Sequence, residues 1–266
     1  MDISEFTPEE LDFAEEQILI DFITPKIKPH KNPKAFLIFG QPGAGKTTLA
    51  SIFSNQTDMD VFFVSGDDYR KYHPRYDKLV EKYGEDAVLH TQKFAGKMTE
   101  SLIQKLSDLK YNLIIEGTLR TKEVPLNTCK LLKEKEYDVT LAGILVRPEI
   151  SYLSTIKRFE MMKEYGAIPR KTPKEHHDNV VSSLTKNLDY LYKKHIFNKI
   201  VIYNREQDKI FDSNITKKNP ADIYKKEFSR KLSKVEIERI KKSFQEYAGK
   251  KIVDIILKQY QNPPGR

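Results

Sequence analysis

The 266-residue chain has one cysteine, no long apolar run and no leader-like N-terminus. A single cysteine, Cys129, excludes an internal disulfide and fits a reducing compartment, and we interpret it as a small buried residue. No run of 18 apolar residues occurs, so we expect no membrane span. Residues Met1–Glu5 are acidic, unlike the start of a signal peptide, and we therefore expect a cytoplasmic protein. No His/Cys cluster has the spacing of a zinc site.

Positive charge is unevenly distributed, although the formal net charge is +8. From Arg205 to Arg266, 16 Lys and Arg residues stand against 9 Asp and Glu residues, whereas residues 1–204 carry 30 against 29. We interpret the basic C-terminal part as a solvated helical face, because aromatic residues do not alternate with its basic ones. A nucleic-acid partner is therefore not favoured.

Short β-branched or aromatic runs alternate with helical patterns along most of the chain. This alternation predicts an α/β fold with a parallel sheet flanked by helices on both faces. We expect one domain over residues 1–266, with a core at about 35–205, a linker at Asp212–Pro220 and a helical basic extension over 221–261. The predicted strands are Ala35–Phe39, Asp60–Val64, Tyr111–Ile115, Val139–Val146 and Lys199–Tyr203, and the predicted helices are Pro8–Phe22, Lys46–Ser54, Thr91–Leu109, Thr121–Lys135, Ile150–Tyr165 and Pro173–Lys193.

A glycine-rich loop follows the first predicted strand and leads into a helix. It matches the pattern G-x-x-x-x-G-K-[ST], the P-loop of nucleoside-triphosphate-binding proteins. Its backbone N–H groups surround a phosphate, which requires conformations and a close approach that glycine permits. Lys46 adds a charge for the β- and γ-phosphates, and Thr47 offers a hydroxyl ligand for Mg²⁺. The sequence thus predicts a P-loop NTPase fold that binds ATP and Mg²⁺ through Gly40, Gln41, Pro42, Gly43, Ala44, Gly45, Lys46, Thr47 and Thr48.

Acidic residues follow two neighbouring predicted strands. The chain has no N-K-x-D guanine motif and no apolar strand that ends in Asp-Glu, which disfavours GTPases and hydrolytic ATPases. Instead, Glu116 ends one strand, and we expect it to help position Mg²⁺ or an acceptor hydroxyl. Another strand is followed by Asp67 and Asp68. We predict that Asp67 is the base that accepts the proton of an attacking hydroxyl, and that Asp68 caps the next helix.

Two arginines lie in the region that follows the fourth predicted strand. Arg158 falls in a helix, and Arg170 falls between Gly166 and Pro173, in a loop where a lid can form. Positive charge there would stabilise a phosphoryl group in transfer. From the residues alone, each is as well explained as a surface arginine.

Several further stretches, taken together, closely resemble the zeta-toxin family of bacterial toxin–antitoxin kinases. The resemblance covers about Ala35 to Tyr203. The stretches that carry it are Gly40–Thr47, Gly66-Asp67 with Arg70 and His73-Pro74, Met98-Thr99-Glu100, Tyr111–Arg120, Ser151–Thr155, Thr172–Asp178 and Tyr203-Asn204-Arg205.

The resemblance implies a kinase that uses ATP and magnesium to phosphorylate a sugar hydroxyl of UDP-N-acetylglucosamine and so blocks cell-wall precursor synthesis. It implies Asp67 as the base, Lys46, Arg158 and Arg170 around the triphosphate, and Thr47 on magnesium. It also implies a small helical antitoxin as partner, for which Pro8–Phe22 is a candidate contact. The implied UDP-sugar pocket comprises Glu100, Glu116, Thr118, Arg120 and Thr128.

Two alternative functions remain open at this point. One is a P-loop kinase of another acceptor, such as a nucleoside, an antibiotic or a polynucleotide end. The other is an ATP-dependent nucleic-acid-binding regulator that uses the basic extension as its grip. Without the resemblance, Glu100 would be interpreted as a surface acid and Thr128 as a structural helix residue.

Overall fold

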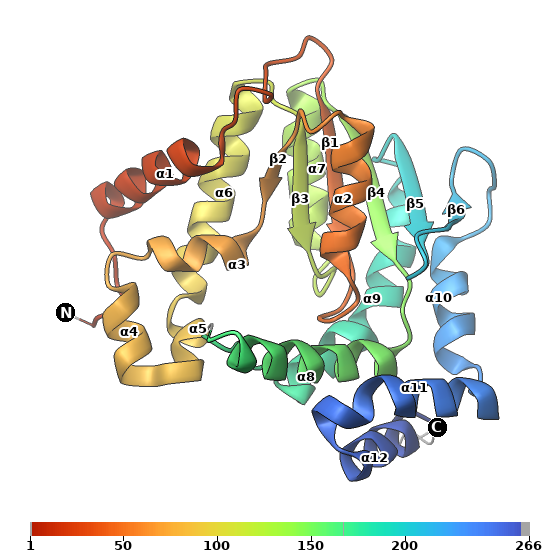
Figure 1. Ribbon diagram of the computed structural model, residues 1–266. Helices are drawn as coiled ribbons and strands as arrows, with labels where there is room; N and C mark the ends of the chain where they lie inside the picture. The colour runs from red at the N-terminus through yellow and green to blue at the C-terminus, as the bar shows by residue number, and fades with distance from the viewer. Residues whose placement is uncertain (1, 167, 262–266) are drawn as a thin grey trace.

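The computed structural model describes residues 2–166 and 168–261, and a six-stranded sheet forms its centre (Figure 1). The strand order is β2-β3-β1-β4-β5-β6, so β1, the first strand of the chain, lies between β3 and β4. The carboxyl ends of β1 to β5 therefore share one edge of the sheet, where ligands of such folds bind. The strands are β1 (Lys34–Phe39), β2 (Phe62–Val64), β3 (Leu113–Gly117), β4 (Asp138–Ile144), β5 (Lys199–Tyr203) and β6 (Lys209–Asp212).

Helices cover both faces of the sheet, as the alternating pattern predicts. The helices are α1 (Pro8–Phe22), α2 (Lys46–Gln56), α3 (Gly66–Tyr69), α4 (Tyr76–Tyr83), α5 (Ala87–His90), α6 (Gln92–Asp108), α7 (Glu123–Glu134), α8 (Pro148–Glu164), α9 (Lys174–Lys194), α10 (Pro220–Ser229), α11 (Lys234–Ala248) and α12 (Lys250–Gln261). Alternate residues of β1 serve different faces. Leu37 and Phe39 pack with α1, α6, α7, α9 and α10, whereas Phe36 and Ile38 pack with α2. Continuous apolar runs are what a doubly covered strand requires.

All five predicted strands are present, but the sheet is not wholly parallel. β6 pairs antiparallel with β5. The sequence analysis did not predict β6, and it assigned the last residue of this strand, Asp212, to a linker. Only residues 204–208 separate β5 from β6, and so short a connection joins antiparallel neighbours. Lys199 and Lys209 both pair with the buried Asp212, at 3.0 and 2.9 Å, and hold this edge strand in place.

The segment between β2 and α6 folds into short helices that the sequence analysis did not predict. The first of them, α3, begins at Gly66 and lies directly against α6. A Cβ atom at Gly66 would lie 3.0 Å from Thr99 Oγ1, so glycine permits this approach. The contact joins two stretches of the family resemblance, Gly66-Asp67 and Met98-Thr99-Glu100, and sets the direction in which α3 leaves the sheet.

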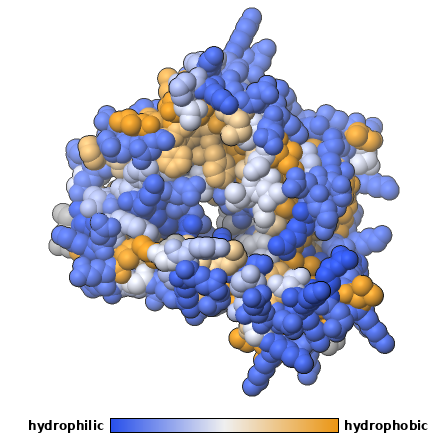
Figure 2. Space-filling model, viewed as in Figure 1, coloured by the Kyte–Doolittle hydropathy of each residue, from blue (hydrophilic) through white to orange (hydrophobic). Residues whose placement is uncertain are grey.

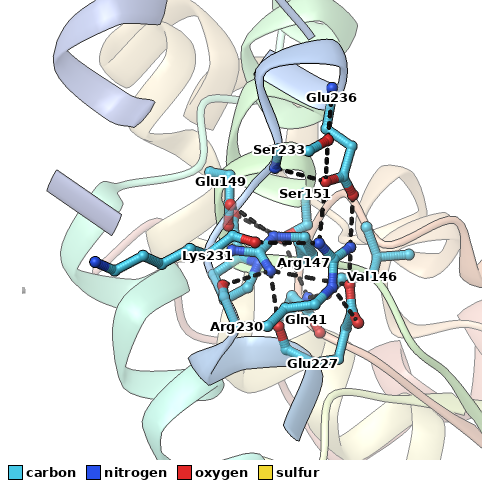
Figure 3. A network of polar contacts seen from close by, with 11 residues as sticks. Gln41, Val146, Arg147, Glu149, Ser151, Glu227, Arg230, Lys231, Ser233 and Glu236 are labelled. Atoms are coloured by element: carbon cyan, nitrogen blue, oxygen red, sulfur yellow. Dashed lines mark hydrogen bonds and ion pairs between the residues drawn. The ribbon is translucent and has the colours of Figure 1, made fainter. Parts of the chain in front are cut away.

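The C-terminal helices α10, α11 and α12 form the predicted helical extension and pack on the rest of the chain. Leu153 of α8 lies in one apolar cluster with Ile240 and Phe244 of α11 and with Val253 of α12. A buried arginine adds a polar tie. Arg147, just after β4, donates to the carbonyl oxygens of Glu227 and Arg230 at 2.8 and 3.0 Å (Figure 3).

Among the helices within residues 2–166 and 168–261, none is both long and apolar enough to cross a membrane.

Arg147 offers a test of how firmly the extension is attached. Its guanidinium also donates to Glu149 Oε1 at 2.7 Å, and the two side chains are 4% and 1% exposed. Removing one member of a buried ion pair leaves the other charge without compensation. Arg147→Ala should therefore lower the free energy of unfolding by about 3–5 kcal/mol in urea titrations. Lys242→Ala, an exposed change on α11, should have little effect, and equal effects of the two changes would contradict this account.

Candidate active site

The phosphate loop is held tightly between β1 and the start of α8. Gly43 and Gly45 have φ angles of +76° and +96°, which disfavour any residue with a side chain. A Cβ atom at Gly43 would lie 2.0 Å from the carbonyl oxygen of Ser151. Both the backbone angle and the lack of space therefore require glycine at Gly43. Because α2 begins at Lys46, the loop leads directly into a helix N-terminus that favours an anion.

Polar side chains fix the two ends of this loop. Gln41 is fully buried, and its amide nitrogen donates to Val146 O at 2.6 Å and to Ser151 Oγ at 3.2 Å. Lys46 Nζ donates to Gly40 O at 3.1 Å and lies 3.4 Å from Glu116 Oε1. The lysine thus lies across the mouth of the loop, at the carboxyl end of β3. Thr47 and Thr48 are exposed beside it.

Asp67 lies at the start of α3 and makes two contacts with arginines. Arg70 Nε donates to Asp67 Oδ1 at 3.0 Å, and Arg170 Nη1 lies 3.5 Å from Asp67 Oδ2. Arg70 is itself held, because its Nη1 donates to Val88 O at 2.8 Å and to Thr91 Oγ1 at 3.0 Å. The Asp67 carboxylate is therefore placed by a guanidinium that Val88 of α5 and Thr91, between α5 and α6, hold in position.

The two neighbouring carboxyls differ in their pKa shifts. Burial favours the neutral form of Asp67, but Arg70, Arg170 and Arg158 outweigh it and lower the Asp67 pKa. Burial and the charges of Glu116 and Asp67 raise the pKa of Asp68 despite Arg170. The lowered pKa keeps Asp67 ionised across the neutral range, as a proton acceptor requires.

The prediction that Asp68 caps the next helix is wrong. Ser65 occupies the N-cap of α3, and Asp68 is the third residue of the helix. Among the described residues, the Asp68 carboxylate accepts no hydrogen bond from a backbone N–H group at the start of α3, so it does not cap this helix.

The two arginines of the predicted lid region join the same cluster. Arg158 lies on α8, and its Nη2 donates to Thr172 Oγ1 at 3.4 Å. Burial and the nearby positive charge of Arg170 lower the Arg158 pKa, while Asp67 and Glu116 act in the opposite direction. The structure thus brings Lys46, Asp67, Glu116, Arg158 and Arg170 together around one space. Of the neighbouring pair Arg170 and Lys171, it is Arg170 that contacts Asp67.

A cavity of about 1060 Å³ adjoins this cluster on the side of the C-terminal extension. Arg158 lines it, so this arginine lies between the cavity and the Asp67 side of the site. Residues that follow β4 and β5, among them Val146 and Asn204, form one wall, and Ile240 and Phe244 of α11 form another. Its mixed apolar and polar lining and its size suit a nucleoside.

The implied UDP-sugar residues are only partly gathered. Glu116 lies within the cluster, where Ser65 Oγ donates to its Oε2 at 3.2 Å. Thr118 accepts a bond from the Arg120 N–H at 3.4 Å, just beyond β3. Glu100 is exposed on α6 and pairs with Lys97 at 3.0 Å, and Thr128 lies half-buried on α7. Within the described part of the chain, no hydrogen bond or ion pair joins these two residues to Asp67.

Arg70 and Ser65 are contacts of the site whose roles the sequence analysis did not assign. Arg70 stands three residues after Asp67, the spacing at which helical side chains meet, and this spacing is the signal that could have found it. The contact of Ser65 with Glu116 joins the ends of β2 and β3, which are far apart in the sequence, so no local pattern predicts it.

Arg70 provides a prediction about the charge on Asp67. Arg70→Gln removes a positive charge that lowers the Asp67 pKa, so that pKa should rise toward its ordinary value of about 3.9. Because a protonated Asp67 accepts no proton, the acid limb of the pH profile of phosphate transfer should move to higher pH. Turnover at neutral pH should fall by about tenfold, because the carboxylate loses the group that orients it. Lys71→Gln, one residue along and exposed, is the control, and superimposable acid limbs would contradict the assignment.

Comparisons with known proteins agree with this geometry. A family model described as Zeta toxin matches residues 20–216. Toxin PezT of Streptococcus pneumoniae is 43% identical over 243 residues, which cover 90% of this chain and 95% of that protein. Toxin zeta of Streptococcus pyogenes is 41% identical over 215 residues, 79% of this chain and 74% of that protein.

One solved structure, from work on the PezAT chromosomal toxin–antitoxin system of S. pneumoniae, superposes with a TM-score of 0.82. It is 38% identical and covers 97% of this chain and 100% of its own. The P-loop α/β fold with its helical C-terminal part is therefore confirmed, as is the kinase-type class of phosphotransferase. On these matches, this chain belongs to the zeta toxin family.

Proposed function

We propose that this protein transfers the γ-phosphoryl group of ATP to a sugar hydroxyl of UDP-N-acetylglucosamine, as the toxin of a toxin–antitoxin system. The observation that carries the proposal is the position of Asp67. Its carboxylate lies beside two arginines, at the same sheet edge as the phosphate loop and Lys46. An ionised acid and several cations around one space are what phosphoryl transfer to a hydroxyl requires.

The loop and its neighbours fit a magnesium-bound triphosphate. The positive φ angles of Gly43 and Gly45 shape a backbone cradle in which no Cβ atom intrudes, and Lys46 lies at its mouth. Within the described residues, no group of three or more His, Cys, Asp or Glu side chains could hold a metal ion. We assign Mg²⁺ to the Thr47 hydroxyl, with phosphate oxygens and water as its other ligands and Glu116 nearby. The ion would neutralise charge on the phosphates.

The remaining chemistry belongs to side chains of this chain. Asp67 would accept the proton of the sugar hydroxyl while the hydroxyl oxygen bonds to the γ-phosphorus. The bond between the γ-phosphorus and the oxygen that bridges it to the β-phosphorus breaks, and ADP leaves. Lys46, Arg158 and Arg170 would stabilise the negative charge on the transferring group. We place the nucleoside of ATP in the cavity that Arg158 lines, on the opposite side from Asp67.

We place the acceptor on the α3 and α6 side of the site. Figure 2 shows the surface hollowed at the centre of this face, above α8 and between α3 and the ends of the strands. Thr118 and Arg120, just after β3, would face a bound sugar nucleotide, and Glu100 and Thr128 stay predicted members of this pocket. Arg120 is exposed and supplies positive charge for a diphosphate.

A small helical antitoxin is the proposed partner. Helix α1 packs on the core through Ala14 and Ile18 but leaves Phe13 and Ile20 65% and 71% exposed. Apolar side chains of this size on an outer helix suit a helical partner. The antitoxin of the PezAT system is a probe for this surface. Phe13→Ser should weaken its binding, and unchanged binding would exclude this part of α1 from the interface.

The alternative of a nucleic-acid-binding regulator is not favoured. The comparisons support a toxin kinase, and several basic residues of the extension are engaged in pairs. Arg230 contacts Glu227 and Glu236, each at 2.7 Å, and Lys241 contacts Asp254 at 3.0 Å. A different kinase acceptor is tested by the same transfer assay with a panel of nucleosides and sugar nucleotides.

Two substitutions separate binding from chemistry. Asp67→Asn keeps the shape of the side chain but removes the proton acceptor, so transfer from labelled ATP to UDP-N-acetylglucosamine should fall by about 10³-fold. Binding of ATP, measured by calorimetry, should stay near normal. Lys46→Ala should abolish both, because the charge at the loop is lost. An Asp67→Asn protein that transfers phosphate at the wild-type rate would overturn the base assignment.

A further inference from the structure

One stretch of the family resemblance, Thr172–Asp178, has no role in the function proposed above apart from the contact of Thr172 with Arg158. In the structure, Lys174, His177 and Asp178 lie in the first turns of α9, and all three meet Tyr260 of α12. The Tyr260 hydroxyl donates to the Asp178 carboxylate and lies 3.2 Å from His177 Nδ1. Lys174 Nζ lies 4.8 Å from the centre of the Tyr260 ring and pairs with Asp178.

These contacts continue from α9 into the phosphate loop. His177 Nε2 lies 2.8 Å from Ser151 Oγ at the start of α8, and both residues are fully buried. Gln41 Nε2 in turn donates to Ser151 Oγ at 3.2 Å. Gln41, Ser151, His177 and Tyr260 thus form one line of polar contacts from the phosphate loop to the last described helix.

The hydrogen-bonding groups along this line have a consistent direction. Burial outweighs the Asp178 carboxylate and lowers the His177 pKa, so the imidazole is neutral at neutral pH. The carboxylate near Nδ1, 3.2 Å away, favours a proton on that nitrogen, which leaves Nε2 to accept from the Ser151 hydroxyl. The Ser151 hydroxyl has one hydrogen and two acceptors within reach, His177 Nε2 at 2.8 Å and Pro148 O at 2.9 Å. With that hydrogen on the His177 side, each group donates to the next from Gln41 to Asp178, and such bonds strengthen one another in a buried setting.

A second contact joins the same elements independently. Figure 3 shows Gln41 beside Val146 and Ser151, with Arg147 reaching the loop between α10 and α11. Val146 O accepts the Gln41 amide at 2.6 Å, and the next residue, Arg147, donates to two carbonyl groups of the extension. The extension therefore contacts a neighbour of each group that orients the Gln41 side chain: Arg147, next to Val146, and His177, which faces Ser151.

We propose that Tyr260 is a positioning residue of the ATP site, which acts through Asp178, His177 and Ser151 on Gln41. The Gln41 amide nitrogen donates one hydrogen bond to Val146 O and one to Ser151 Oγ. The Gln41 amide oxygen, Oε1, has no hydrogen-bond partner among the described residues. The orientation of Gln41, and with it the backbone between Gly40 and Gly43, depends on those acceptors. Loss of the Tyr260 hydroxyl leaves the Asp178 carboxylate held by Lys174 through Oδ2 only, so the Oδ1 atom that faces His177 is less fixed. His177, Ser151 and Gln41 are then less well oriented, and the loop amides lose part of their alignment toward phosphate.

The inference rests on the proposed function only in taking the loop as the ATP site. Its test is ATP binding without any acceptor, so the result does not depend on which hydroxyl is phosphorylated. Tyr260→Phe should raise the Kd for ATP with Mg²⁺ by about tenfold, the scale of one hydrogen bond lost from a buried line. In the transfer assay, KM for ATP should rise similarly, while kcat stays within about twofold because Asp67 is untouched.

A matched control lies in the same extension. Tyr247→Phe removes the same atom from α11, where the Tyr247 ring faces Lys157 and the hydroxyl makes no hydrogen bond to a described residue. This variant should bind ATP as the wild type does. Ser151→Ala breaks the line at its centre, so adding Tyr260→Phe to it should weaken binding no further.

Thermal melting of each variant separates positioning from stability. A Tyr260→Phe protein that melts lower yet binds ATP with the wild-type Kd would overturn the proposal, because the hydroxyl would then serve stability alone. Losses that add in the Ser151→Ala, Tyr260→Phe double variant would overturn it as well. A wild-type protein that binds ATP but phosphorylates no sugar nucleotide would leave this inference standing while the proposed acceptor falls.

Discussion

The packing of Gly43 against the Ser151 carbonyl is the constraint on which the rest of the site depends. No side chain fits there, since a Cβ atom would lie 2.0 Å from the Ser151 oxygen. The contact presses the phosphate loop against the first turn of α8, the helix that also carries Arg158. This packing thus ties the backbone of the phosphate loop to the helix that carries Arg158, the arginine that we propose faces the phosphate. Neither element could shift alone without opening this contact.

Charge within the site is balanced by pairs that cross between strand ends. Lys46 from the loop meets Glu116 at the end of β3, and Asp67 after β2 meets Arg70 and Arg170. Such pairing compensates each charge while no ligand is bound, and under the proposed function each could exchange its partner for a phosphate or a metal ion. The same pairing lowers the Asp67 pKa, so the group that we propose as proton acceptor remains charged at neutral pH. Electrostatics and position therefore favour the same residue as base.

The sequence predicted local features well and long-range contacts poorly. The loop from Gly40 to Thr47 is a contiguous pattern. Helix α1 likewise begins with a local pattern, the N-cap Thr7 followed by a proline and two glutamates. The edge strand β6 is short and polar at its ends, so its pattern did not stand out from a turn. The contact of His177 with Ser151 joins residues 26 apart, and that of Tyr260 with Asp178 joins residues 82 apart. Contacts of this kind come from the packing of α8, α9 and α12, which a pattern along the chain does not contain. Asp68 shows the same limit at short range, because its role depended on where α3 begins.

Transfer of phosphate to the sugar nucleotide is the most direct test of the central claim. The wild-type protein would be incubated with ATP, Mg²⁺ and UDP-N-acetylglucosamine, and the acceptor would be analysed by mass spectrometry and phosphorus NMR. The account predicts that the sugar nucleotide gains one phosphoryl group, seen as a new phosphomonoester, in step with the ADP formed. The account would be contradicted if ADP formed at the same rate with and without the sugar nucleotide and the mass of the sugar nucleotide stayed unchanged.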